Sequence, residues 1–142
     1  MEAALISAAA AIFVAALTSY LTKAKEREAA WRAKKLDYYE TFFDAVSGNV
    51  GDAIPPQAKI NFANAVNNLH LIASQDVIDA LHELCDEIAE SNAAQFSKER
   101  HDRIWSRLVW HIRADLSDAP KKSLEEFEAR LWASGVGSNV KS

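Results

Sequence analysis

The residues best suited to bind an anion lie between positions 23 and 35. This segment holds six Lys or Arg and two Glu, a local net charge of +4, whereas residues 36–142 carry −7. Four of the cations form two pairs seven residues apart, which places each pair on one helix face: Lys25 with Arg32, and Arg27 with Lys34. We call residues 23–35 the basic collar. Its cations suit anionic lipid head groups, at about 1 kcal/mol per residue, or, in a ring of several helices, a phosphate-bearing nucleotide or oligonucleotide.

A face of small and hydroxyl-bearing side chains precedes the collar. It consists of Ser7, Ala11, Thr18 and Thr22, and its heptad line continues through Lys25 and Arg32 to Tyr39. In a ring of helices, such a face predicts the wall of a water-filled pore. In a simple anchor, the hydroxyls can instead bond to their own backbone, so both interpretations stay open. Small residues at four-residue spacing favour close helix packing and hence a homo-oligomer: Ala3, Ser7, Ala11, Ala15 and Ser19.

No cluster of residues in the sequence predicts catalysis, a cofactor or a metal site. Arg107 and His111 share a helix face, but metal-independent helical ribonucleases of the HEPN type separate Arg from His by more residues. We expect the arginines of residues 100–113 to pair with acidic neighbours or to snorkel around the bundle instead. Spacing suggests no partner for His70 or His82. The acidic residues of segment 76–90 lack the Glu-x-x-His pairs of di-metal bundles and predict a solvated face: Asp76, Asp79, Glu83, Asp86, Glu87 and Glu90.

The segment from Ala3 to Leu21 is long and apolar enough to cross a bilayer. Its nineteen residues carry no charge, and a span needs about 20 mostly apolar residues. The cations follow this segment, whereas those of a signal peptide precede its apolar region. By the positive-inside rule, the N-terminus faces outwards and the collar is cytoplasmic. We therefore predict a single-pass protein of the inner (cytoplasmic) membrane, with a buried Ala-rich helix of a soluble protein as the alternative.

The rest of the chain predicts a helical bundle. No Gly or Pro occurs from Glu2 to Ser47, so one continuous helix is expected there. Further helices are expected over 57–73, after an N-cap at Ser74, from Ser97 to about 116, and after a capping box at Ser123 with a stop at Gly135. The predicted class is all-α, an N-terminal transmembrane helix continuous with a cytoplasmic helical bundle. The expected parts are a span (1–22), the collar (23–35), the bundle (36–135) and a flexible tail (136–142).

Four segments carry a resemblance to a known group of proteins: AKEREAAWRAKKLDYYETFFDAV, NNLHLIASQDVIDAL, LVWHIRADL and RLWASG. They resemble small single-span membrane effectors of bacterial anti-phage defence, most closely the channel effector of Hailong-type systems. The resemblance implies a channel whose opening depletes the infected cell and which is controlled by a nucleotide or oligonucleotide from a partner nucleotidyltransferase. It further implies that basic residues on the conducting path bind a single-stranded DNA oligomer that keeps the channel shut. Lys25 and Arg32, then Arg27 and Lys34, are the positions that it would assign first.

Three functions are consistent with these observations. The leading hypothesis is an oligomeric channel-forming effector, without enzymatic activity, that an anionic nucleotide or oligonucleotide gates at the collar. The alternative is a membrane-anchored helical adaptor that recruits a cytoplasmic partner protein. The third is an RNA-cleaving bundle that depends on His111.

Overall fold

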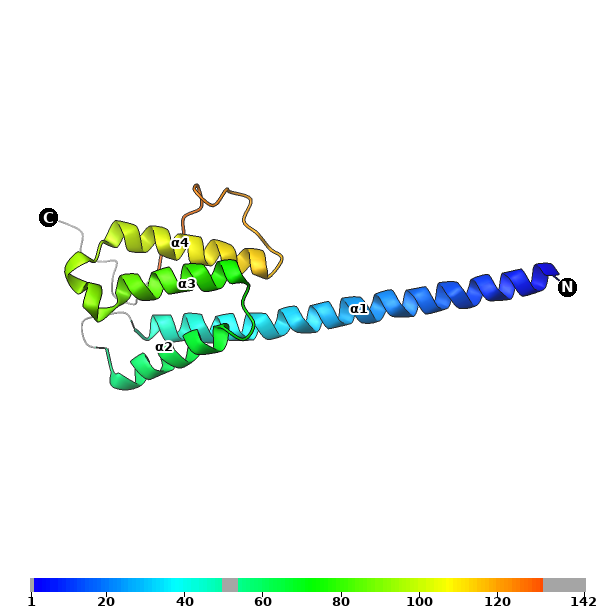
Figure 1. Cartoon of the computed structure of the whole chain (residues 1–142), viewed down its shortest axis with the longest axis horizontal. Helices are drawn as coiled ribbons and strands as arrows, with labels where there is room; N and C mark the ends of the chain where they lie inside the picture. The colour runs from blue at the N-terminus through cyan, green and yellow to red at the C-terminus, as the bar shows by residue number, and fades with distance from the viewer. Residues whose placement is uncertain (1, 50–53, 132–142) are drawn as a thin grey trace. The chain divides into compact units, whose positions relative to one another are not determined.

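The computed structural model describes residues 2–49 and 54–131, with side chains from residue 6 onwards. In these ranges every regular element is helical (Figure 1): α1 (Glu2–Ser47), α2 (Pro56–Leu69), α3 (Gln75–Ile88), the 3-10 helix η1 (Glu90–Gln95) and α4 (Lys98–Asp115). The chain divides into two compact units, Met1–Lys34 and Lys35–Ser142. The predicted all-α class is confirmed, because a long apolar N-terminal helix is followed by shorter helices.

Helix α1 continues without interruption for 46 residues, as the absence of Gly and Pro predicts. It ends at a turn in which the Gly48 amide donates a hydrogen bond to the Asp44 carbonyl at 3.1 Å. The side-chain amide of Asn49 then donates to the carbonyls of Ala45, at 2.8 Å, and Ala58, at 2.9 Å. This one side chain therefore ties the end of α1 to the first turn of α2.

The second unit is held together by one hydrophobic core, to which four helices contribute. Helices α3 and α4 pack directly on each other, and aromatic contacts join the end of α1 to α2 and α4. The ring centroids lie 6.1 Å apart for Phe42 and Phe62 and 5.4 Å apart for Phe43 and Trp105. Burial of each large apolar side chain contributes about 1.5–3 kcal/mol. The buried cluster consists of Tyr39, Phe42, Val46, Ala65, Leu69, Val77, Ala80, Leu81, Leu84, Trp105, Leu108 and Ile112.

The helix expected after Ser123 is not present in the described part of that segment. Residues 124–126 form a single turn, closed by the Phe127 amide, which donates to the Ser123 carbonyl at 3.0 Å. Further along, the Ala129 amide donates to the Oγ atom of buried Ser106 in α4 at 3.0 Å. The Ala129 amide thus donates to a side chain of α4. In a helix, the same amide would donate to a carbonyl of the preceding turn. Helix α2 also ends at Leu69, short of the expected residue 73, and the expected stop at Gly135 and tail 136–142 lie outside the described residues.

The C-terminus of α4 has the hydrogen bonds of a Schellman motif. The Asp118 amide donates to the Arg113 carbonyl, and the Ser117 amide donates to the Ala114 carbonyl, both at 2.9 Å. Ser117 occupies the left-handed position of this motif, with φ of 60°. Glycine is the usual residue there, because a Cβ atom disfavours that conformation.

Candidate functional site

The apolar part of α1 is the first functional feature of the chain. The stretch Ile6–Ser47 contains an 18-residue window of mean hydropathy 1.5, long and apolar enough to cross a membrane, and none of it is buried within the structure. Ile12 and Phe13, for example, are 72% and 68% exposed. Soluble monomers rarely leave a contiguous apolar surface of this extent in water. The exposed apolar surface of this helix is therefore a candidate for contact with lipid or with another protein.

The residues predicted to line a pore lie on the same helix. Ser7, Ala11, Thr18 and Thr22 are all exposed. Further along α1, the hydroxyls of Thr41 and Ser47 donate to the carbonyls four residues earlier, at 2.9 Å. Neither Thr18 nor Thr22 makes such a bond to any residue that the structure describes, so these two hydroxyls are available to water or to a neighbouring helix.

Five of the six collar cations are exposed on α1, Lys35 being the exception. Arg32 Nη2 lies 3.7 Å from Glu28 Oε1, a long and exposed pair of small energetic value. Within the described residues, Lys25, Arg27 and Lys34 make no ion pair. Three of the four predicted ligand-binding side chains are therefore not engaged by an acidic residue that the structure describes.

Lys35 and Tyr39 belong to the second unit and not to the exposed face predicted to bind an anion. The Lys35 ammonium donates to Asp115 Oδ1 at 2.7 Å, with only 12% of the Lys35 side chain exposed. The Tyr39 hydroxyl, on a residue that is 1% exposed, donates to Asp115 Oδ2 at 2.5 Å. Burial, followed by the hydrogen bond to Asp115, raises the pKa of Tyr39 well above its ordinary value. The heptad line is predicted to run on to Tyr39. Arg32 is its last exposed residue, because Tyr39 is buried.

The arginines of residues 100–113 pair with carboxylates, as expected. Arg103 Nη1 lies 2.6 Å from Glu99 Oε1 and Arg113 Nη2 lies 2.7 Å from Asp118 Oδ2. Arg107 forms an ion pair with Glu83 of α3, the neighbouring helix. His111 packs edge-on against Trp110, with the ring centroids 5.4 Å apart, and makes no hydrogen bond to a described residue. Arg107, the arginine that shares a helix face with His111, thus has its guanidinium engaged by Glu83.

Glu87 is buried, contrary to the prediction that it belongs to a solvated acidic face. Its carboxylate accepts two hydrogen bonds from Arg100, at 2.6 and 3.1 Å, and one from the Ser97 amide at 3.0 Å. Asn92 Nδ2 donates to the Glu87 carbonyl at 2.9 Å. The bonds from Arg100, then that from Ser97, lower the pKa of Glu87. This carboxylate therefore fixes η1 and the first turn of α4 against the end of α3.

The other acidic side chains of that face are exposed, as predicted: Asp76, Asp79, Glu83, Asp86 and Glu90. Cys85, on the opposite face, packs against the core. Burial raises the pKa of its thiol, which disfavours the reactive thiolate. A structural role in the core therefore fits Cys85 better than nucleophilic chemistry.

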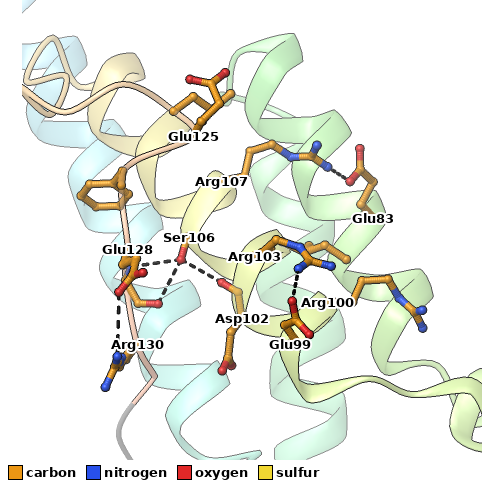
Figure 2. A pocket seen from close by; sticks show the side chains of 14 residues that line it. Glu83, Glu99, Arg100, Asp102, Arg103, Ser106, Arg107, Glu125, Glu128 and Arg130 are labelled. Atoms are coloured by element: carbon orange, nitrogen blue, oxygen red, sulfur yellow. Dashed lines mark hydrogen bonds and ion pairs between the residues drawn. The ribbon is translucent and has the colours of Figure 1, made fainter.

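A cleft lies between α3, α4 and the segment 124–130, all within the second unit (Figure 2). Four arginines and five acidic residues line it, and the Arg107–Glu83 and Arg103–Glu99 pairs lie at its edge. Because the charges nearly balance, the cleft offers no net attraction for a phosphate group. Its mixed charges, together with Leu124 and Phe127, are better suited to a protein segment.

Comparisons with known proteins assign no family to this chain. No protein-family model matches it, and the searches of curated proteins and of solved structures return no similar protein. The three candidate sites are therefore defined by charge, exposure and geometry alone. They are the apolar part of α1, the collar, and the cleft of the second unit.

Proposed function

We propose that this protein is an oligomeric single-span membrane effector whose α1 helices associate to form a channel. The observation that carries the proposal is the unburied apolar window of α1, which a bilayer and neighbouring copies of the same helix would cover. The helical unit that follows remains in the cytoplasm, and the N-terminus faces outwards, because the cations lie on the C-terminal side of the window. The resemblance to anti-phage effectors supplies the proposed setting, the inner membrane of an infected bacterium.

The hydroxyl and collar residues support conduction and its control. In a ring of α1 helices, the unbonded hydroxyls of Thr18 and Thr22 face the axis, where they replace part of the hydration of a passing ion. Lys25 and Arg32 then form rings of positive charge at the cytoplasmic mouth. A nucleotide or oligonucleotide binds there through its phosphates, and its binding shifts the channel between closed and open states.

Reconstitution of the purified full chain into liposomes tests the proposal directly. We expect an oligomer in detergent and an ion flux that responds to a single-stranded DNA oligonucleotide. A protein that is monomeric in detergent and supports no flux, with or without the oligonucleotide, would refute the channel.

Charge-matched variants test the collar. The variant Lys25→Ala/Arg32→Ala removes two predicted phosphate contacts, so the slope of log affinity against log salt should fall by about 1.4 per protomer for single-stranded DNA. The control Lys121→Ala/Lys122→Ala loses the same charge from exposed positions of the second unit and should keep the slope. Equal slopes for the two variants would remove the collar from ligand binding.

The cleft of the second unit favours a second candidate, a membrane-anchored adaptor. Its balanced charges and half-buried apolar side chains suit a partner protein segment. Replacing residues 3–21 by an unrelated Leu-rich span separates the two candidates. An adaptor should keep its activity in cells, because the second unit is still held at the membrane, whereas a channel should lose it, because the pore wall has been removed.

A further inference from the structure

Two exposed histidines, twelve residues apart in the sequence, meet across the turn between α2 and α3. The Nε2 atoms of His70 and His82 lie 2.9 Å apart. The ring centroids are separated by 5.1 Å with an interplanar angle of 34°, so the rings meet at their nitrogen-bearing edges and do not stack. This pair lies away from the core and plays no part in the channel, the collar or the cleft.

A hydrogen bond fixes which nitrogen of His70 carries the proton. His70 Nδ1 lies 3.0 Å from the Val66 carbonyl oxygen, and a carbonyl can only accept, so Nδ1 is the donor. The Nε2 atom of the neutral ring is thus left with a lone pair that points at His82. Metal-binding histidines are oriented in the same way, by a bond from the second ring nitrogen to a backbone carbonyl.

In the structure, the 2.9 Å separation is that of a hydrogen bond in which His82 Nε2 donates to His70 Nε2. The same separation allows both nitrogens to bind one divalent transition metal once the rings tilt so that both lone pairs point at the ion. With metal–nitrogen bonds of about 2.0–2.1 Å, nitrogens 2.9 Å apart subtend an angle of about 90° at the ion. That angle is the one between adjacent ligands in the tetragonal and square-planar sites of Cu²⁺ and Ni²⁺. A tetrahedral Zn²⁺ would need the nitrogens about 3.3 Å apart.

We propose that His70 and His82 form a two-imidazole site for Cu²⁺ or Ni²⁺ that clips the end of α2 to the middle of α3. Binding requires the His82 proton to move from Nε2 to Nδ1, so that both Nε2 lone pairs reach the ion. Among the described residues, no group of three or more His, Cys, Asp or Glu could hold an ion. Water therefore fills the remaining coordination positions, and the metal exchanges with solvent. The bound ion stabilises the fold, because the unfolded chain does not hold the two rings together.

Metal titration of the full chain in detergent tests this site, with Cu²⁺ and Ni²⁺ as probes. We expect one Cu²⁺ per chain with the electron paramagnetic resonance pattern of two nitrogen ligands, and a rise in unfolding temperature on metal addition. His70→Gln and His82→Gln should each weaken Cu²⁺ binding by at least about tenfold. Even a change to a group that only orients a metal ligand typically weakens metal binding by that much. Both variants should also abolish the rise in unfolding temperature.

The two remaining histidines provide matched controls. His101→Gln and His111→Gln remove an imidazole from α4 and should leave both the affinity and the two-nitrogen pattern unchanged. Because His70 and His82 are exposed, their variants should fold, which circular dichroism without metal verifies. Equal Cu²⁺ binding by all four variants, or a pattern from fewer than two nitrogens in the unaltered chain, would overturn the proposal.

Discussion

The hydrogen bond between Tyr39 and Asp115 provides a quantitative test of the second unit. Tyr39→Phe removes only the hydroxyl, and the ring still fills its place in the core. The bond is 2.5 Å long, and its acceptor is a carboxylate whose side chain is 7% exposed. A hydrogen bond to a charged group contributes about 1.5–3 kcal/mol. We therefore expect Tyr39→Phe to lower the free energy of unfolding by about 2 kcal/mol.

Urea unfolding of the full chain in detergent, followed by tryptophan fluorescence, measures this loss. Buried Trp105 reports on the core. With an m value of about 2 kcal/mol/M, the midpoint should fall by about 1 M. The effect also depends on pH, because burial and Asp115 raise the pKa of Tyr39 above its ordinary value of 10.0. The stability that the neutral hydroxyl contributes is complete below that value and decreases as the pH rises above it, where the unfolded chain ionises. The difference between the two proteins should therefore shrink at alkaline pH.

The neighbouring tyrosine is a matched control for this experiment. Tyr38 is half-buried against the same core, but its hydroxyl makes no hydrogen bond to a residue that the structure describes. Tyr38→Phe should therefore change the unfolding free energy by less than about 0.5 kcal/mol. If Tyr39→Phe were as small in effect as Tyr38→Phe, the Tyr39–Asp115 bond would make no net contribution and the assigned geometry would be wrong.

Four further substitutions test the second unit by the same unfolding assay. Leu81→Ala should cost about 2–5 kcal/mol because it leaves a cavity in the core, whereas Leu71→Ala, on a side chain that is 73% exposed, should be nearly neutral. Glu87→Gln should reduce the loss of unfolding free energy at acid pH. The stability due to the lowered pKa of Glu87 is complete above the ordinary value of 4.5 and is lost as the pH falls through the folded-state pKa. An unchanged dependence of stability on acid pH would contradict this prediction. Ser117→Gly should raise the unfolding free energy by about 1 kcal/mol, because it removes the Cβ atom from a left-handed position. An unchanged unfolding free energy would show that the backbone at Ser117 is not strained.

The helices were predictable from the sequence because their signals are local. The uninterrupted α1 follows from the absence of Gly and Pro before Gly48, and the N-cap of α4 from Ser97, whose Oγ accepts a hydrogen bond from the Arg100 amide at 3.3 Å. The apolar residues of α3 recur at helical spacing, and Val77, Leu81 and Leu84 among them are buried. In each case neighbours along the chain determine the outcome.

The failures of prediction share a cause, since a distant residue decided each. The sequence predicts Glu87 on an exposed acidic face, but Arg100, thirteen residues away, binds its carboxylate and Glu87 is buried. The capping box at Ser123 favours a helix, but Ser106 binds the backbone of that segment 23 residues away. The meeting of His70 and His82 depends on the path of the turn between α2 and α3, which spacing alone does not define. The collar and pore assignments remain predictions, because they concern contacts with other chains and with lipid.

The link between Lys35 and Asp115 also bears on the order of events during synthesis. The two residues are 80 positions apart, and the core contributions of Leu108 and Ile112 are made just as late in the chain. At about 5–20 residues per second, roughly 4–16 s separate the synthesis of these two ends. For all of that time the apolar part of α1 has already been made while the second unit lacks α4. In the proposed single-span protein, delivery of the span to the membrane therefore precedes folding of the second unit. A chain that did not reach a membrane would expose the apolar part of α1 and the unfinished core of the second unit at the same time.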